Sequence, residues 1–392
     1  MRKEPTHNLP FQKRRSMIIW VKILKLTLPG APSGWRAESY INPRDPLLHK
    51  WRIIVNQPID QADAWFVCED LELDSETCLV PREMVFIGAS EALYEPDWII
   101  SSPGVFAFYS QFNLAFTFNY FSPQKTVPSI PFLPWMLNAN HGPTIFNQPN
   151  FTEIVDYKLN LDSKLNRIAL VCSNQSLTSG HRIRKAFAAE LIKYFGKHVD
   201  WYGNGIMTFS TKQELYSKYK YSIVLENQAR NDVVTEKLGD AFLGFTYPFY
   251  WGAPNVDKYF HSKGFEVIDI LDFSSTMEKI ENALTHKLFE SKLDHIIENR
   301  LKVLFEHNFL HRILKIVDQN LVNNESKPMP VTLNSISRFN ETFGHSSSSL
   351  SGKAFSKLRS FDDKYQINSA PLLQELKVLL MNNPITRILK RR

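Results

Sequence analysis

The stretch 221–252 constrains the fold of this chain more than any other segment. It begins with a short run of β-branched and aromatic residues, Tyr221–Leu225, which predicts a buried strand. A polar loop follows, then a helix expected from about Val234 to Gly244, and a second apolar strand at Tyr247–Trp251. Such a unit is typical of an open parallel sheet, which binds its ligands beyond the carboxyl ends of the strands. The loop is therefore the candidate site.

The polar side chains of this unit suit an anionic ligand. Glu226 and Asn227 follow the first strand, and Thr235, Glu236 and Lys237 occupy the first turn of the helix. A helix N-terminus presents unpaired N–H groups and the positive end of its dipole, which both favour a phosphate. The sequence therefore predicts that a phosphate binds between the end of the strand and the start of the helix.

The order of these residues resembles the donor-binding signature of the family 10 α-1,3/4-fucosyltransferases. The matching positions are Glu226-Asn227, Asp232, the VTEK run at Val234–Lys237 and the YWGAP run at Tyr250–Pro254. One position departs from the signature, because the family has a tyrosine where this chain has Val233. The resemblance implies that the bound donor is GDP-fucose.

The resemblance also implies roles for the residues of the signature. Glu236 would bind the ribose hydroxyls of the nucleotide. Lys237 would face the diphosphate, where transfer of the sugar builds up negative charge. Asn227 can donate and accept hydrogen bonds around the donor. Glu226 has two interpretations: it is a donor-site residue, or it is a carboxylate buried against a lysine.

A second segment supplies the other half of the predicted diphosphate site. A strand at Asn166–Ser173 runs into a polar loop, and Arg182 and Arg184 open the next helix. An arginine in a first helical turn opposes the helix dipole, unless it faces a bound phosphate. The family has a comparable S-N-x-n-R motif, which implies donor-binding roles for Ser173, Asn174 and Arg184. Arg182 is the alternative to Arg184.

An inverting transfer needs a base for the proton of the acceptor hydroxyl, and a carboxylate of the opposite domain is the expected source. The strand expected at Met84–Ile87 leads to Ser90 and Glu91. This segment resembles the strand-G-E-x-x-x-P-D-[FW] pattern of the family, with one extra residue before Pro96. Glu91 is therefore the predicted catalytic base and Glu95 the second choice. The alternative is that Glu91 is a non-catalytic surface residue.

The expected fold is α/β, with two Rossmann-type, doubly wound domains and a helical C-terminal tail. Residues 1–150 are predicted to form an N-terminal, acceptor-side α/β domain, residues 151–325 the nucleotide-sugar-binding domain, and residues 326–392 a polar linker and basic amphipathic tail. The family resemblance, which covers about Asn166 to Phe273, implies that the two domains face each other across a cleft in the GT-B arrangement. Apolar runs predict strands at 51–55, 64–67, 84–87, 166–173, 198–202, 221–225, 247–251 and 265–270, and helices at 182–195, 212–219 and about 275–322.

Composition is that of an ordinary globular protein, with 43% hydrophobic and 22% charged residues. Cys68, Cys78 and Cys172 show no C-x-x-C or metal-ligand spacing, which predicts buried thiols in a reducing compartment. The sequence shows no His/Cys cluster, and no D-x-D motif follows a strand. We therefore expect no required metal cofactor, because Arg184 and Lys237 could neutralise the diphosphate. Mn²⁺ or Mg²⁺ could still stimulate the reaction.

Two segments bear on membrane contact. Met17–Leu28 is short and interrupted by lysines, so we interpret it as a first core strand rather than a signal peptide. Without a membrane anchor, we expect a bacterial, cytoplasmic protein, at most attached to the inner face of the membrane.

The segment Ala370–Arg392 has a leucine face and a basic end, which is typical of a membrane-surface helix or of one docked on the enzyme's own core. The net charge of +6 suits an anionic membrane. No basic motif interleaved with aromatic residues indicates nucleic acid.

The family resemblance thus implies an inverting glycosyltransferase that moves L-fucose from GDP-fucose to a hydroxyl of an N-acetylglucosamine or glucose unit, through an α-1,3 or α-1,4 linkage. The expected acceptor is an oligosaccharide or glycolipid of a surface glycan, such as lipopolysaccharide O-antigen. One alternative is the same fold with another nucleotide-sugar donor, because Val233 removes an aromatic hydroxyl from the signature. The other is a glycan- or nucleotide-binding protein without catalytic turnover.

Overall fold

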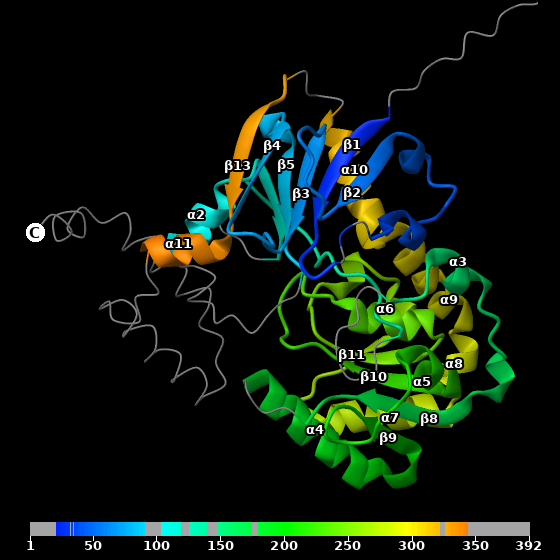
Figure 1. Ribbon diagram of the computed structural model, residues 1–392. Coiled ribbons are helices and arrows are strands. Elements are labelled where there is room, and N and C mark those ends of the chain that lie inside the picture. Colours follow the sequence, from blue (N-terminus) through cyan, green and yellow to red (C-terminus); the bar gives the residue numbers. More distant parts are fainter. Residues whose placement is uncertain are drawn as a thin grey trace, which may run out of the picture.

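The computed structural model describes residues 21–31, 33, 35–90, 103–118, 125–138, 147–174, 179–321 and 326–343. Within these residues the chain forms two parallel sheets and one antiparallel strand pair, with helices packed around them (Figure 1). The predicted α/β fold with two parallel sheets is therefore confirmed.

The first sheet has the strand order β2-β1-β3-β5-β6-β7, and every neighbouring pair is parallel. Its central strand β3 has the sequence AWFVC and is buried at every position, as expected for a parallel strand covered on both faces. The strands are β1 (Lys22–Thr27), β2 (Trp51–Val55), β3 (Ala64–Cys68), β5 (Val85–Gly88), β6 (Leu114–Thr117) and β7 (Thr126–Pro128), and helix α2 (Pro103–Tyr109) lies between β5 and β6 in the chain.

The second sheet has the order β12-β11-β10-β8-β9 and is also fully parallel. The strands predicted in this half are present, but the one expected at 265–270 is reduced to two residues. Asp269 ends it, because its side chain accepts from Leu271 N and its carbonyl accepts from Asp272 N, which makes a turn. The elements are β8 (Leu165–Val171), α4 (Ser179–Phe195), β9 (Val199–Tyr202), α5 (Lys212–Lys218), β10 (Tyr219–Leu225), α6 (Glu236–Leu243), β11 (Tyr247–Trp251) and β12 (Glu266–Val267).

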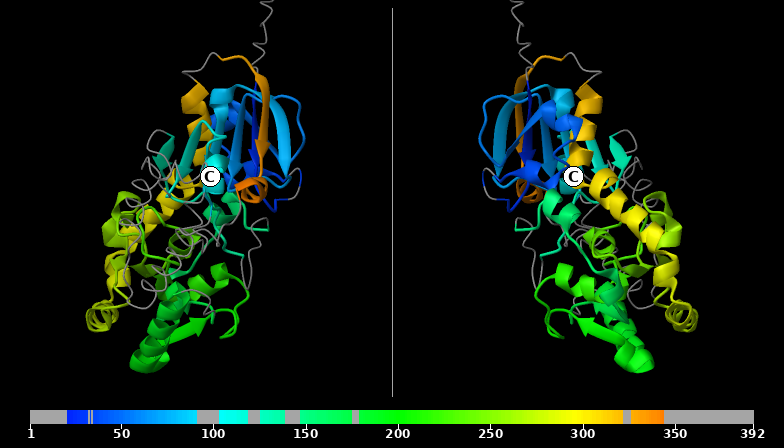
Figure 2. Two further views of the ribbon diagram at one scale, coloured as in Figure 1. Left: turned by 90° about the vertical axis from the view of Figure 1, so that its left-hand side faces the viewer. Right: turned by 90° about the vertical axis from the view of Figure 1, so that its right-hand side faces the viewer.

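The helices after the second sheet lead the chain back to the first domain. Asn308, just before α10, donates to Tyr40 O at 2.6 Å, and Asp318 accepts from the indole of Trp51 at 3.2 Å. Helix α10 therefore packs beside the first sheet, as the side views also show (Figure 2). The remaining helices are α3 (Phe151–Asp156), α7 (Phe273–Thr285), α8 (Leu288–Ser291), α9 (Leu293–Leu301), a π-helical turn (Lys302–Glu306) and α10 (Phe309–Leu321).

The segment predicted as linker and tail from residue 326 begins instead with regular structure. Strand β13 (Met329–Asn334) pairs antiparallel with β4 (Ser75–Val80), and α11 (Ile336–Phe343) packs against α2. Val331 and Leu333 are buried in this pairing, which is why the segment joins the first domain. Residues from 344 onward, including the leucine-rich basic end, lie outside the described residues. The domain limits at 150 and 325 stay a prediction.

The structure also bears on the predictions for the first strand, the cysteines and membrane-spanning helices. Lys22–Thr27 is a core strand with four buried residues at its end, as expected of the second half of 17–28. The three cysteines are free and buried, and burial raises the pKa of each thiol. Among the described residues no helix is long and apolar enough to cross a bilayer. Short 3₁₀ helices complete the fold at 37–40, 46–49, 82–84, 161–163, 196–198, 256–258 and 262–264.

Candidate functional site

The candidate site lies at the point where the second sheet reverses its strand order. From β8 the chain continues to β9 on one side, whereas β10 pairs with β8 on the other side. In open α/β sheets the crevice outside the carboxyl ends of two such strands binds the ligand. The segments that follow β8 and β10 are the two that the sequence predicted to hold a diphosphate.

Glu226, the first residue after β10, is completely buried. Its carboxylate accepts hydrogen bonds from Thr235 N at 2.8 Å and Thr235 Oγ1 at 2.7 Å, and it lies 3.4 Å from Lys237 Nζ. Burial raises the pKa of Glu226 despite the opposing charge of Lys237. Of the two interpretations of Glu226, these contacts favour burial against a lysine, because the carboxylate is engaged by the start of α6.

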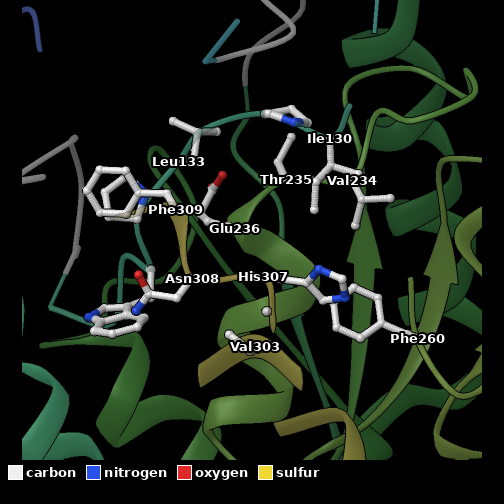
Figure 3. Close-up of a pocket in the computed structure, with 14 residues that line it drawn as sticks. Ile130, Leu133, Val234, Thr235, Glu236, Phe260, Val303, His307, Asn308 and Phe309 are labelled. Atoms are coloured by element: carbon white, nitrogen blue, oxygen red, sulfur yellow. The ribbon is translucent and has the colours of Figure 1, made fainter. Parts of the chain in front are cut away.

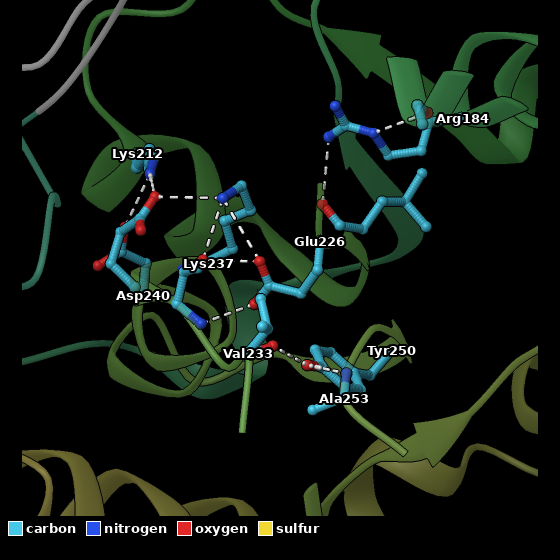
Figure 4. Close-up of polar contacts among 12 residues, drawn as sticks. Arg184, Lys212, Glu226, Val233, Lys237, Asp240, Tyr250 and Ala253 are labelled. Carbon is cyan, nitrogen blue, oxygen red and sulfur yellow. Dashed lines mark hydrogen bonds and ion pairs between the residues drawn. The ribbon is translucent and has the colours of Figure 1, made fainter. Parts of the chain in front are cut away.

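Thr235 begins α6 as its N-cap, and its hydroxyl accepts from Lys237 N at 3.4 Å. Lys237 Nζ lies 3.0 Å from the same hydroxyl and 3.8 Å from the carboxylate of Glu236 (Figure 4). The side chain of Lys237 keeps 23% of its surface exposed. The lysine is thus held at the helix N-terminus by two carboxylates and a hydroxyl, and it remains accessible to a ligand there.

Behind Glu236 lies a buried pair that the sequence did not reveal. Lys212 Nζ is 2.8 Å from Asp240 Oδ2 and 3.8 Å from Glu236 Oε1, and Asp240 also accepts from Met136 N at 2.9 Å. Burial raises the pKa of Asp240 to about 6, although Lys212 opposes the shift. At Glu236 burial also raises the pKa, but Lys237 and Lys212 outweigh it and the net shift is downward. Glu236 therefore stays ionised and can accept hydrogen bonds from hydroxyl groups.

Arg184 is the arginine that the fold directs at this crevice. Its side chain is buried, and it donates from Nε to Gly180 O at 3.2 Å and from Nη1 to Leu225 O at 3.4 Å. These bonds hold the guanidinium at the carboxyl end of β10, one residue before Glu226 (Figure 4). Arg182, the competing candidate, is exposed. Of the two arginines, Arg184 is therefore the one with contacts at the carboxyl end of β10.

Ser173 and Asn174 follow β8 at the other wall of the crevice, where Ser173 is half-buried and Asn174 exposed. Asn174 N donates to Asn204 O at 2.9 Å, which joins the two loops. Gly203 allows this approach, since a Cβ there would lie 2.5 Å from Cys172 O and its φ of +148° suits glycine. The half-buried Asn227 follows Glu226 at the end of β10.

The loop between β10 and α6 is braced by Asp232, whose role the signature did not reveal. Asp232 adopts a left-handed backbone conformation with φ of +65°. Its carboxylate accepts from Asn255 Nδ2 at 2.7 Å and from the hydroxyl of Tyr259 at 2.5 Å, and its N–H donates to Asn255 Oδ1. Strained residues persist where surrounding contacts hold them, and here those contacts fix the approach to α6.

Val233, the departure from the signature, is buried completely. It forms a small apolar cluster with Ala89 and Phe118, which follow β5 and β6 of the first sheet. The valine therefore fills a contact between the two domains.

A pocket beside Glu236 lies between the chain that joins the two sheets and the start of α10 (Figure 3). His307 is one of the polar residues that line the pocket. Its Nε2 lies 2.7 Å from Tyr259 O, and burial lowers the pKa of the ring to about 4. The imidazole is therefore neutral and donates from Nε2. The pocket is lined by Ile130, Pro131, Leu133, Pro134, Trp135, Val234, Thr235, Glu236, Gly239, Phe260, Val303, His307, Asn308 and Phe309.

The two candidates for the catalytic base, Glu91 and Glu95, lie outside the described residues. Ser90, the last described residue before them, donates its N–H to Glu69 Oε2 at 2.8 Å, and its hydroxyl donates to the same oxygen. Glu69 follows β3 and has a φ of +70°. Ser90 is next to Ala89, which contacts Val233. The chain therefore enters the segment of Glu91 beside the donor loop.

One feature of the fold bears on possible metal sites. The sequence indicated no cluster of histidines, but the fold brings His261, His295 and Glu298 together, with ligand atoms within 4.8 Å of one another. No sequence motif marks this group, because the two histidines lie 34 positions apart. This group is separate from the residues predicted to bind the diphosphate.

Comparison with known proteins agrees with the position of this site. Residues 161–288 match the model of glycosyltransferase family 10 (fucosyltransferase), C-terminal domain. A segment of 94 residues is 39% identical to an alpha-(1,3)-fucosyltransferase, FucT, of Helicobacter pylori, and covers 24% of this chain and 19% of that relative. The chain thus matches about a fifth of the length of this curated relative.

Solved structures also resemble this chain. A crystal structure of an alpha1,3-fucosyltransferase with GDP covers 81% of this chain and 95% of its own, at 17% identity and a TM-score of 0.47. An alpha-glucosyltransferase in complex with UDP-glucose and DNA containing an abasic site covers 76% of this chain and 99% of its own, at 9% identity and a TM-score of 0.46. At these sequence identities and TM-scores, the solved structures add nothing to the architecture that the strand pairings define.

Proposed function

We propose that this protein is an inverting fucosyltransferase that uses GDP-fucose. The observation that supports the proposal most is the position of three residues at the switch point of the second sheet: Arg184 contacts the end of β10, and Glu236 and Lys237 begin α6, all inside the segment that matches the family 10 model. The two cations are suited to a leaving diphosphate and the ionised carboxylate to ribose hydroxyls. This is the set of groups that a nucleotide-sugar donor requires.

In the proposed reaction the acceptor hydroxyl attacks C1 of fucose while the bond from C1 to the diphosphate oxygen breaks. The electron pair of that bond leaves with GDP, and the hydroxyl proton passes to a carboxylate, for which Glu91 is our candidate and Glu95 the second choice. Attack from the opposite face inverts the configuration at C1. Arg184 and Lys237 would stabilise the charge that develops on the diphosphate.

The acceptor is proposed to be an N-acetylglucosamine or glucose unit of an oligosaccharide or glycolipid in a surface glycan, such as lipopolysaccharide O-antigen. Both α-1,3 and α-1,4 linkages stay open. Transfer from GDP-fucose to free and lipid-linked acceptors, followed by linkage analysis of the product, identifies the acceptor. Transfer to neither class of acceptor would contradict this part of the proposal.

A panel of nucleotide sugars tests the choice of donor. We expect GDP and GDP-fucose to raise the melting temperature more than UDP- or CMP-sugars, because a ligand stabilises the fold by RT ln(1 + [L]/Kd). Val233 favours a second candidate, the same reaction with another donor, and a larger shift with a different nucleotide sugar would support it. A third reading, a binding protein without turnover, predicts a shift with GDP-fucose but neither transfer nor slow hydrolysis.

We propose that the transfer requires no metal at the diphosphate, since two cations are available there, and that Mn²⁺ or Mg²⁺ at most stimulates it. Activity should therefore persist in EDTA. Loss of activity in EDTA that Mn²⁺ or Mg²⁺ restores would overturn this point.

We also propose that the basic end of the chain, Lys390, Arg391 and Arg392, brings the enzyme to the cytoplasmic face of an anionic membrane. Each basic residue near such a surface adds about 1 kcal/mol of attraction at low salt. Replacing all three with glutamate should abolish co-sedimentation with anionic liposomes and leave transfer to a small soluble acceptor intact. Equal co-sedimentation of both proteins would refute the membrane contact.

A further inference from the structure

Three side chains from two separate elements face one another at the outer side of α9. His295 and Glu298 lie one helical turn apart on α9, and His261 comes from the turn that precedes the 3₁₀ helix Ser262–Gly264. Each offers a metal-ligand atom, and these atoms lie within 4.8 Å of one another. Residues three apart on a helix share a face, so the two ligands of α9 point in the same direction.

The backbone around this group is fixed by direct contacts. Asn299 of α9 accepts from His261 N at 2.7 Å and donates to His261 O at 3.0 Å. Gly264 approaches α9 so closely that a Cβ there would lie 2.4 Å from Asn299 Nδ2 and 2.7 Å from His295 O. The turn and the helix are therefore locked together, and His261 is held opposite His295 whether or not the side chains interact.

The side chains are already close to a ligand arrangement. His295 Nδ1 lies 3.0 Å from Glu298 Oε2, and this hydrogen bond lowers the pKa of Glu298, so the carboxylate is ionised. The rings of His261 and His295 are stacked with centroids 4.5 Å apart and an angle of 5° between their planes. The bond from Lys263 N to His261 Nδ1 is long, at 3.3 Å, and can be given up easily.

We propose that His261, His295 and Glu298 bind a zinc-like transition-metal ion, with water as the fourth ligand. Two imidazoles and a carboxylate are a ligand set for Zn²⁺ and Co²⁺, whereas Mg²⁺ prefers oxygen alone. Adjacent ligands of a tetrahedral ion with bonds of about 2.1 Å lie about 3.4 Å apart. The ion takes the place of the proton between His295 and Glu298, and His261 rotates out of the stack to complete the site.

Such an ion would strengthen a segment that also serves the donor site. Tyr259, two residues before His261, donates its hydroxyl to Asp232 of the donor loop. Phe260 lines the pocket beside Glu236. A metal ion that links His261 to α9 would therefore restrain residues 259–261. The ion itself would not contact Arg184 or Lys237.

Calorimetric titration of the untagged full-length protein with Zn²⁺, and with Mg²⁺ for comparison, tests the site without reference to enzyme activity. We expect saturable binding of zinc, no binding of Mg²⁺, and at least a tenfold loss of zinc affinity in His261→Ala and in His295→Ala. His286→Ala is the matched control, because this histidine follows the last residue of α7 and contacts Asn282 O. Its zinc affinity should equal that of the wild type.

Two further measurements separate ligation from other effects. Co²⁺ should give the visible absorption of a four-coordinate ion in the wild type and in His286→Ala, and Glu298→Gln should weaken or change it. Zinc affinity should also fall in acid, because protons compete with the metal ion for its ligands. Zinc affinity that is equal in all variants, or no saturable binding at millimolar zinc, overturns the proposal.

Discussion

The carboxyl edges of the two parallel sheets carry different chemistry. At the edge of the second sheet, Arg184 and Lys237 converge on the crevice between β8 and β10, and Glu226 holds the helix start in place. At the same edge of the first sheet, Ala89 and Phe118 form an apolar contact with Val233. The edge of the second sheet thus holds the charged residues, whereas the described edge of the first sheet packs against the loop between β10 and α6.

The difference shows that two parallel sheets of the same kind can have different functions. A parallel sheet directs whatever follows its strands to one edge, and the loops decide what chemistry arrives there. In the second domain a single local unit supplies acid, amide and cation. In the first domain the described polar pair, Glu69 and Ser90, leads into the segment of Glu91. We therefore expect the first sheet to supply the base and the second to bind the donor.

The largest effect should come from the first sheet. Glu91→Gln keeps the shape of the side chain but cannot accept a proton, so transfer should fall by about 10²-fold or more while GDP affinity is unchanged. Steady-state transfer assays and calorimetry with GDP measure the two quantities. Glu95→Gln is the control and should keep most of its activity. If Glu95→Gln is the impaired variant, the base is Glu95, and two active variants remove both from this role.

Arg184→Ala and Lys237→Ala test the second sheet. Each should weaken GDP binding by about 1.5–3 kcal/mol, the usual size of a hydrogen bond to a charged group. Lys237→Ala should also lower the melting temperature, because buried Glu226 loses its cation. Arg182→Ala is the matched control on the same helix and should bind GDP normally. Unchanged GDP affinity in both variants would show that the diphosphate binds elsewhere.

The second domain could be predicted from sequence because its information is local. Strand, loop, helix and strand follow one another within residues 219–251, and each has its own apolar pattern or cap. The positions of Glu226, Asn227, Glu236 and Lys237 follow directly from that order. Arg184 required only the preceding strand and helix.

The contacts that complete the site could not be predicted in this way, because they join distant parts of the chain. Strand β13 pairs with β4 across some 250 residues, and His261 meets His295 only after the intervening helices fold. Lys212 and Asp240 each resemble ordinary surface charges in the sequence, yet they form a buried pair behind Glu236. No periodic pattern marks such pairs, since burial of a charge depends on tertiary packing.

His307 lies where the chain passes from the second sheet back to the first, and it makes the stability of this region sensitive to acid. Its folded-state pKa of about 4 is below the ordinary value, because burial disfavours the charged ring. Protons therefore bind better to the unfolded chain, and stability falls as the pH drops from about 6.5 to 4. We expect a loss of about 2 kcal/mol over this range, less than the full shift implies, because the ring is only partly buried.

Urea denaturation at pH 7 and pH 4.5 measures this loss. His307→Gln can still donate to Tyr259 O but does not titrate, so its stability should change less between the two pH values. His286→Ala, which removes an exposed histidine just after α7, should retain the acid sensitivity of the wild type. An equal loss of stability in His307→Gln and the wild type would assign the effect to other groups.

The smallest effect should come from the brace of the donor loop. Asp232→Ala removes the acceptor of the bonds from Asn255 and Tyr259 and places alanine at a φ of +65°. The loop should then sample other conformations, and GDP affinity should fall by about tenfold, near the lower end of the range for one hydrogen bond to a charged group. Asp232→Asn keeps an oxygen acceptor and tolerates the left-handed backbone, so its affinity should stay close to that of the wild type. Calorimetry with GDP on the three proteins decides the matter. If Asp232→Ala binds GDP as well as the wild type, the contact of Val233 with the first sheet positions the loop without help from Asp232. If Asp232→Asn is as weak as Asp232→Ala, the carboxylate charge is what the loop requires.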